Sequence, residues 1–308
     1  MPAPVQMRIN HKIIRILPLF GRSFREFKKN DPLRMAGATS FFATFALPAV
    51  LIILIQTFGL FVTPRFMSRQ LFNNLGDVLG THTAVELRKT LLNVRHLIRT
   101  WYEGLFGFLF LIFVATTLLK VVKDSLNQLW DIRLLPSTGL GFNLLNRVKS
   151  LAVILFAGLL FLFVLLAEGA LDILYHTPED RALGHGILAK AFIRQLISLL
   201  LVSAWFFMLL KFLPDAKPRW RTVLAGAVFT GLLFTLGKLL LSWLLSYSNM
   251  QTIYGASTSS VLLLLFVFYS SFIFYFGACF TKIWAAFYND PIQPGPHAEK
   301  YQWSRVRG

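Results

Sequence analysis

The sequence contains few of the residues from which most catalytic and metal-binding sites are built. Its 308 residues include one cysteine, Cys279, and six histidines that are scattered over predicted helix ends and loops. A single cysteine excludes a disulfide framework within the chain. No His-Glu-x-x-His, Cys-x-x-Cys, Walker or Gly-x-Ser-x-Gly pattern is present, so no metal, nucleotide or nucleophile motif is recognisable. We therefore expect no cofactor, no metal and no catalytic residue.

Charged residues are also scarce. They make up 15% of the chain, against 56% hydrophobic residues, whereas a soluble domain averages about 25% charged residues. The mean hydropathy of +0.61 agrees with a membrane protein. The formal charge of +17 suggests nucleic acid only where basic residues form one face of a soluble domain, so we expect no nucleic-acid partner. The charged N-terminus lacks an apolar core and a cleavage site, and we expect no cleaved signal peptide.

Six apolar stretches are long enough to cross a bilayer, which takes about 20 residues. They predict an all-α polytopic membrane protein with six transmembrane helices. The predicted spans are 36–62, 104–122, 151–173, 191–213, 222–246 and 257–287.

The basic residues predict the orientation of these spans. Of the 31 lysines and arginines, 21 fall in the N-terminal segment, the second and fourth connections and the C-terminal end, and eight fall in the other connections. Because cytoplasmic loops carry the excess of Lys and Arg, both termini are predicted to be cytoplasmic. This charge also predicts contact with anionic lipid head groups on that side.

Two segments outside the spans have helical amphipathic patterns. Residues 8–29 repeat Ile and Phe at three-to-four spacing against Arg and Lys, which is typical of an interfacial helix, and Pro18 is expected to bend it. The first external connection, 63–103, contains a similar stripe. It can serve as a lid packed on the spans or as a gate. The chain then divides into a basic segment 1–35, a transmembrane domain 36–290 and a basic cytoplasmic tail 291–308.

Lys238 is unusual because it interrupts the predicted fifth span. A lysine at the centre of a transmembrane helix costs roughly 2.5–3.5 kcal/mol on insertion scales. Counted from Thr222 it lies roughly 24 Å from the cytoplasmic end, and Glu168 lies roughly 25 Å along the predicted third span at 1.5 Å per residue. Asp172 and Arg194 border the same layer.

The candidate intramembrane polar cluster is therefore Glu168, Asp172, Arg194 and Lys238. Two interpretations stay open. The cluster is either a buried ion pair that fixes helix register, or a polar cavity that accepts a charged head group or an ion.

Small residues predict where the helices approach closely. Ala227, Gly231 and Thr235 recur every fourth position, and Ser270 and Gly277 share one face of the last span, as membrane helix interfaces require. Lys238 follows Gly231 by seven residues, so it is predicted to point toward the bundle interior. Pro48 in the first span permits a kink.

Several segments, in order, resemble the YihY/virulence factor BrkB family of membrane proteins. These are "MAGATSFFATFALPAVLIIL" in the first span, "NQLWDI" at 127–132, the Leu-Pro linker followed by Gly237-Lys238, and a last span running from Tyr254-Gly255 to Gly277-Ala278. The resemblance covers roughly residues 30–290. Cys279 stands where the family pattern leads us to expect an acid, and any role of that carboxylate is absent here.

The resemblance implies a six-span bacterial inner-membrane protein linked with envelope integrity, with a proposed role in transport, including that of lipids. The family's older label, ribonuclease BN, conflicts with the residues, because RNA hydrolysis needs metal ligands or an acid–base pair on the cytoplasmic side. We expect a transporter-like or lipid-translocating protein. The alternatives are a structural or scaffolding membrane protein and, third, a membrane enzyme. A homo-oligomer or envelope protein partners are left open.

Overall fold

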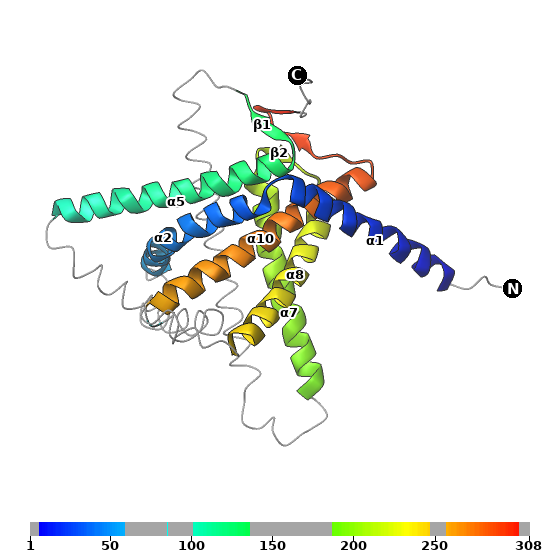
Figure 1. The fold of residues 1–308 in the computed structure, drawn as a ribbon, viewed down its shortest axis with the longest axis horizontal. Helices are drawn as coiled ribbons and strands as arrows, with labels where there is room; N and C mark the ends of the chain where they lie inside the picture. Colours follow the sequence, from blue (N-terminus) through cyan, green and yellow to red (C-terminus); the bar gives the residue numbers. More distant parts are fainter. Residues whose placement is uncertain (1–5, 59–84, 86–100, 136–186, 247–256, 302–308) are drawn as a thin grey trace.

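The computed structural model describes residues 6–58, 85, 101–135, 187–246 and 257–301, and these are predominantly helical (Figure 1). The helices are α1 (Gln6–Lys29), α2 (Pro32–Phe58), α5 (Trp101–Leu129), α7 (Ile187–Phe212), α8 (Trp220–Ser246) and α10 (Thr258–Phe287). The predicted N-terminal helix 8–29 corresponds to α1. The first, second, fourth, fifth and sixth predicted spans correspond to the other five helices. The predicted third span, 151–173, lies outside the described residues, as does most of the 63–103 connection.

Three of the described helices are long and apolar enough to cross a membrane. The qualifying stretches are Gln195–Phe212 in α7, Trp220–Leu241 in α8 and Ser260–Phe287 in α10. Their outward faces carry large exposed apolar side chains such as Leu236, Leu239 and Trp243, which is the surface that lipid covers. The helical membrane-protein class is therefore confirmed, whereas the count of six spans and the orientation of the termini stay predictions.

The five helices that follow α1 converge at one end and spread apart toward the other (Figure 1). α10 lies centrally and packs against α2 and α8, while α5 packs on α2 and α7 packs on α8. The ends that converge are those the sequence assigns to the cytoplasm. The core is concentrated there, and its largest fully buried side chains include Trp130, Tyr275, Phe27 and Phe206.

α1 is amphipathic, and it also packs against the helix bundle. Pro18 lies within it, and the residues that follow pack on α10. Leu19 and Phe27 are buried, and the ring of Phe27 lies 4.8 Å from that of Phe272. Phe20 and Phe24 stay about half exposed, yet each meets the edge of Phe276. The sequence predicts an interfacial helix, and the structure adds that its C-terminal half is held on the bundle.

Three helices end at this converging side with an Asp or Asn in the left-handed backbone region. Asp31 follows α1, Asp131 follows α5 and Asn289 follows α10, with φ values of 51°, 55° and 53°. Glycine usually occupies this position after a helix, and Asn and Asp are the other residues that tolerate it. After α10 the amide of Asn289 donates to the carbonyl of Ala286, and that of Asp290 donates to Ala285, which is the Schellman hydrogen-bonding pattern.

α8 and α10 approach closely through two reciprocal glycine–threonine contacts. A Cβ atom on Gly226 would lie 1.9 Å from Thr281 Oγ1, and one on Gly277 would lie 1.8 Å from Thr230 Oγ1. Each threonine hydroxyl donates to the carbonyl one turn earlier in its own helix, Thr230 to Gly226 and Thr281 to Gly277. The hydroxyls are therefore satisfied internally, and only glycine fits opposite them.

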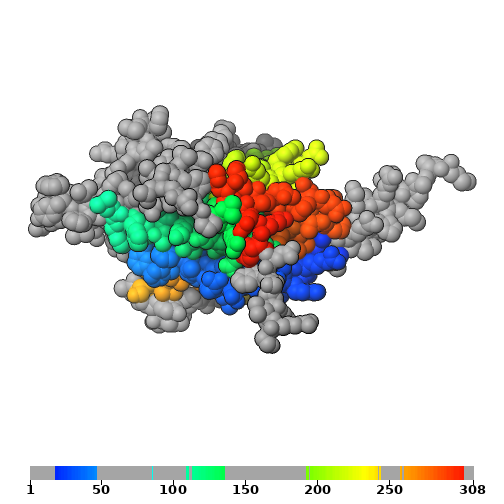
Figure 2. Space-filling view, turned by 90° about the horizontal axis from the view of Figure 1, so that it is seen from above, coloured from blue at the N-terminus to red at the C-terminus, as the bar shows by residue number. Residues whose placement is uncertain are grey.

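Two short antiparallel sheets, which the all-α prediction did not include, join the helix connections. β1 (Ile132–Leu134) pairs with β4 (Ala298–Lys300), and β2 (Ala216–Lys217) pairs with β3 (Gln293–Pro294). Figure 2 shows the C-terminal residues, in red, lying against the end of α5 and β1. The predicted tail 291–308 is thus folded onto the bundle over residues 293–300.

Candidate functional site

The predicted intramembrane cluster lies only partly within the described residues. Lys238 is half-buried on α8, and no acid of the described segments forms an ion pair with it. Arg194 lies in α7, directly before its apolar stretch, but its side chain is outside the description. Glu168 and Asp172 are outside the described residues altogether. The pairing of Lys238 with Glu168 therefore stays a prediction.

The small residues predicted for helix packing lie between helices. Ala227 is fully buried, and a Cβ on Gly231 would lie 2.4 Å from Ser203 Oγ of α7. Next to Lys238, a Cβ on Gly237 would lie 2.8 Å from Ile273 Cδ1 of α10. Lys238 thus follows a tightly packed position on the same helix.

The polar groups of the other predicted residues form hydrogen bonds within their own helices. The hydroxyls of Thr235 and Ser270 donate to the carbonyls four residues earlier, those of Gly231 and Phe266. Gly277 contacts Thr230, as described above. Pro48 lies inside α2, and its side chain is outside the description. Thr235, Ser270 and Gly277 thus serve hydrogen bonding within their own helices or close packing between helices.

The converging ends of the helices carry a charge cluster that the sequence reasoning missed. Lys282 of α10 forms ion pairs with Glu26 of α1, at 2.6 Å, and with Asp131 after α5, at 2.7 Å. About a fifth of the Lys282 and Glu26 side chains is exposed. The indole of Trp130 donates to the carbonyl of Ala278 at 3.0 Å. One lysine therefore joins three segments that are far apart in the sequence.

A second set of polar contacts ties α5 to the α7–α8 connection. Lys123 pairs with Asp215 at 2.7 Å. The Asn127 amide donates to the Asp215 carboxylate, and the Asp215 backbone amide donates to the Asn127 carbonyl, each at 2.9 Å. Because the Asn127 side chain both donates and accepts a hydrogen bond, it fixes the position of the connection more specifically than an ion pair alone. Asn127, Trp130 and Asp131 all belong to the "NQLWDI" segment, whose resemblance to a family pattern was the one sequence signal for this region.

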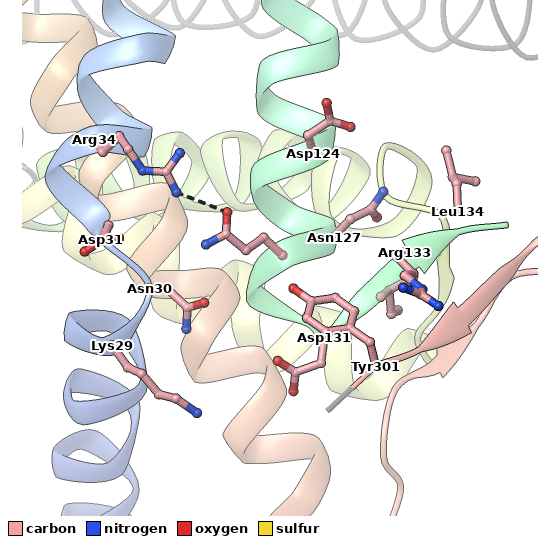
Figure 3. A pocket seen from close by; sticks show the side chains of 12 residues that line it. Lys29, Asn30, Asp31, Arg34, Asp124, Asn127, Asp131, Arg133, Leu134 and Tyr301 are labelled. Atoms are coloured by element: carbon pink, nitrogen blue, oxygen red, sulfur yellow. Dashed lines mark hydrogen bonds between the residues drawn. The ribbon is translucent and has the colours of Figure 1, made fainter. Parts of the chain in front are cut away.

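An open pocket of about 860 Å³ lies beside these contacts, between the α1–α2 turn, the end of α5 and β1 (Figure 3). Most of its lining residues are polar, and they carry both signs of charge. The lining residues are Lys29, Asn30, Asp31, Arg34, Asp124, Asn127, Gln128, Asp131, Ile132, Arg133, Leu134 and Tyr301. Arg34 donates to the Gln128 side chain across the pocket at 3.3 Å.

Asp124 is the lining acid whose titration is perturbed. Burial raises the pKa of its carboxyl above the usual value, against the lowering effect of Lys120 and Lys123, and Asp215 also raises it. The side chain nevertheless keeps an exposed surface, so solvent screens the charges around it. A carboxylate in such a position gains from an added cation.

The lining of this pocket presents groups that are suited to binding a ligand. Among the described residues no group of three His, Cys, Asp or Glu side chains is arranged to hold a metal ion. Cys279 is fully buried about one turn before Lys282. The pocket instead presents amides, guanidinium, ammonium and carboxylate groups, which suit a small charged ligand.

The segments that suggested a family resemblance can now be compared with known proteins. The sequence profile of the family described as Virulence factor BrkB matches residues 23–302, which include α2, the Asn127–Ile132 segment and α10. The chain belongs to the virulence factor BrkB family. The resemblance inferred from the sequence is thereby confirmed, and the chain is an integral membrane protein of that family.

BrkB-family relatives support this assignment at modest identity. A UPF0761 membrane protein from Pseudomonas aeruginosa (strain LESB58) is 30% identical over 213 residues, 68% of this chain and 47% of that protein. A UPF0761 membrane protein from Saccharophagus degradans is 24% identical over 281 residues, 91% of this chain and 62% of that protein. The chain thus spans about half the length of the first of these relatives. No solved structure matches the chain.

Proposed function

We propose that this BrkB-family chain is a transporter-like protein of the bacterial inner membrane that moves an amphipathic, lipid-like substrate and thereby supports the envelope. In this proposal it catalyses no covalent step and binds no nucleic acid. Its partners are membrane lipids, with anionic head groups at the cytoplasmic face. The observation on which the proposal rests is Lys238, a half-buried lysine within an apolar helix stretch.

Two features of the architecture support the proposal. The helices spread apart away from their converging end (Figure 1), and Lys238 lies in the part of α8 that spreads. An ammonium group in a membrane helix is retained where it meets a polar pathway or an acidic partner. It suits the phosphate of a lipid head group as readily as it suits Glu168.

Reconstitution into liposomes tests the proposal. Fluorescent lipids of several head-group classes are followed for movement between leaflets, with wild type, Lys238→Met and Lys238→Arg. We expect movement of at least one class by the wild type, a loss of about tenfold in Lys238→Met, equivalent to about 1.4 kcal/mol, and partial activity in Lys238→Arg. Leu239→Met is the matched control, because Leu239 is the exposed neighbour on the same helix.

Two outcomes contradict the proposal. The wild type moves no lipid class, or Lys238→Met is as active as Leu239→Met. Either result favours the alternative, a scaffolding membrane protein. The contacts of α1 and of the C-terminal strands with the bundle provide such a protein with a built cytoplasmic surface.

A further inference from the structure

The pocket at the converging ends has walls of opposite charge. Lys29 and Arg34 come from the α1–α2 side, and Asp124 comes from α5 on the other side (Figure 3). Asp31 lies in the α1–α2 turn as well, so that side carries two positive charges and one negative charge. A ligand that fills the space between these walls meets a net positive side and a negative side.

Two other charges of the lining already have ion-pair partners. Asp131 pairs with Lys282, and Arg133 pairs with Glu299 across the β1–β4 sheet at 2.6 Å. By contrast, Lys29, Arg34 and Asp124 form no ion pair with any described side chain. The amides of Asn30, Asn127 and Gln128 add neutral hydrogen-bonding groups to the lining.

We propose that this pocket binds a phosphate ester that carries a primary ammonium group, the chemistry of an ethanolamine phosphate head group. The phosphate is held by Arg34, whose planar donor fork matches phosphate oxygens, and Lys29 adds positive charge on the same side of the pocket. The ammonium group is held by the carboxylate of Asp124. A simple anion is disfavoured because Asp124 and Asp31 repel it, and a simple cation is disfavoured by Lys29 and Arg34.

The position of the pocket fits a ligand drawn from the cytoplasmic leaflet. It lies where α1 passes into α2 and where α5 ends, which is the side predicted to be cytoplasmic. Two sources offer the same head group, namely phosphatidylethanolamine in the membrane and a soluble glycerophosphoethanolamine. The site is separate from Lys238 and does not depend on lipid movement.

The titration of Asp124 agrees with this assignment. Its raised pKa indicates that the protein alone does not fully compensate the carboxylate. A bound ammonium group supplies the missing positive charge, and binding should lower that pKa toward its usual value.

Competition binding to the purified full chain in detergent micelles tests the proposal. Short-chain phosphatidylethanolamine, phosphatidylglycerol, phosphatidylcholine and glycerophosphoethanolamine are titrated, and bound species are counted by native mass spectrometry. The variants are Asp124→Asn, Arg34→Gln and Lys28→Gln. Lys28 is exposed on α1 and outside the pocket lining, so its variant is the control for an equal change of charge.

We expect the wild type to prefer phosphatidylethanolamine over phosphatidylglycerol by about tenfold, the effect of one charge-assisted hydrogen bond. Asp124→Asn should abolish this preference by raising the affinity for phosphatidylglycerol relative to phosphatidylethanolamine. Arg34→Gln should weaken both lipids. Phosphatidylcholine should bind more weakly than phosphatidylethanolamine, because its methylated ammonium donates no hydrogen bonds.

Equal binding of phosphatidylethanolamine and phosphatidylglycerol by the wild type overturns the proposal, as does an unchanged preference in Asp124→Asn. A loss in Lys28→Gln as large as that in Arg34→Gln also overturns it, because the effect is then one of net charge. If glycerophosphoethanolamine binds as tightly as the lipid, the ligand of this pocket comes from a soluble source. If it does not bind, the ligand comes from the membrane. If Lys238 variants that no longer move lipid still bind phosphatidylethanolamine in this pocket, the pocket proposal holds independently of the transport proposal.

Discussion

At the scale of single residues, the reciprocal contacts between α8 and α10 are the most constrained positions described. Gly226 and Gly277 each face a threonine hydroxyl at a separation that leaves no room for a methyl group. The threonines cannot turn away without giving up the hydrogen bonds to their own helices. The two helices are therefore expected to move as one unit.

We predict that Gly226→Ala lowers the stability of the protein by about 1–3 kcal/mol, the usual cost of overpacking. Thermal unfolding in detergent is the measurement. Gly37→Ala in α2 is the control, because a Cβ there meets nothing within 4 Å and alanine favours the helix. Thr281→Ala should restore part of the stability to Gly226→Ala. Equal melting temperatures for Gly226→Ala and Gly37→Ala would contradict the packing argument.

Asp124 predicts a dependence of stability on pH. Because burial raises its pKa in the folded protein, the charged carboxylate opposes folding at neutral pH, and the opposition disappears as the pH falls below the usual value near 4. Asp124→Asn should therefore be more stable than the wild type at pH 7, by less than about 1 kcal/mol for a partly exposed group. The difference should shrink as the pH falls through the raised pKa and vanish below about pH 3. A variant that is less stable at pH 7 contradicts this assignment.

The sequence identifies residues that act within one helix better than residues that meet across helices. The stripe of Ala227 and Gly231 follows from spacing alone. The contact of Gly226 with Thr281 and the pairing of Lys282 with Glu26 do not, because the partners lie on different helices whose rotation is unknown beforehand. Lys282 lies near the end of the long last span, where a lysine is normally interpreted as a flanking charge. Its role depends on the path of α1.

At the scale of elements, the apolar runs predict the helices well because each run is longer than 18 residues. The sheets escape prediction, since each strand has two or three residues and no alternation can be recognised over such a length. They form because the connections are brought side by side by helices that have already packed. The left-handed backbone conformations of Asp31, Asp131 and Asn289 cannot be predicted from the sequence either, because Asp and Asn also occur in many other conformations.

Lys282 connects three elements, and its removal should loosen two of them. Lys282→Met leaves the Glu26 and Asp131 carboxylates without their shared cation, which we expect to cost about 2 kcal/mol for a group that is partly exposed. Hydrogen exchange should become faster in the second half of α1 and after α5, and should stay unchanged in α7.

Arg133→Gln provides the comparison for Lys282→Met. It removes an ion pair whose arginine is 67% exposed, so the expected loss is below about 1 kcal/mol. α1 should keep its protection in this variant. Faster exchange of α1 in Arg133→Gln, or no change in Lys282→Met, would show that Lys282 does not hold α1.

At the scale of the whole molecule, the orientation in the membrane is open to a direct test. In a Cys279→Ser background we place single cysteines by Lys28→Cys, Pro296→Cys and Arg181→Cys. Lys28 and Pro296 are exposed, and the basic residues around them predict the cytoplasmic side. A membrane-impermeant maleimide should label position 181 in intact spheroplasts, and positions 28 and 296 only after permeabilisation. The reverse pattern would invert the assignment of the pocket to the cytoplasm.

The spread of the helices has a mechanical consequence. Ion pairs gather near the end where the helices meet, among Glu26, Asp131, Lys282, Lys123 and Asp215. We therefore expect that end to serve as the pivot for any tilt of the helices. A tilt of about 5° at the pivot shifts the far tip of a 27-residue helix such as α8 by about 3.5 Å, given a length of about 40 Å. A displacement smaller than one side chain at the converging ends of the helices therefore becomes a larger separation, of about one atom's width, between their far ends.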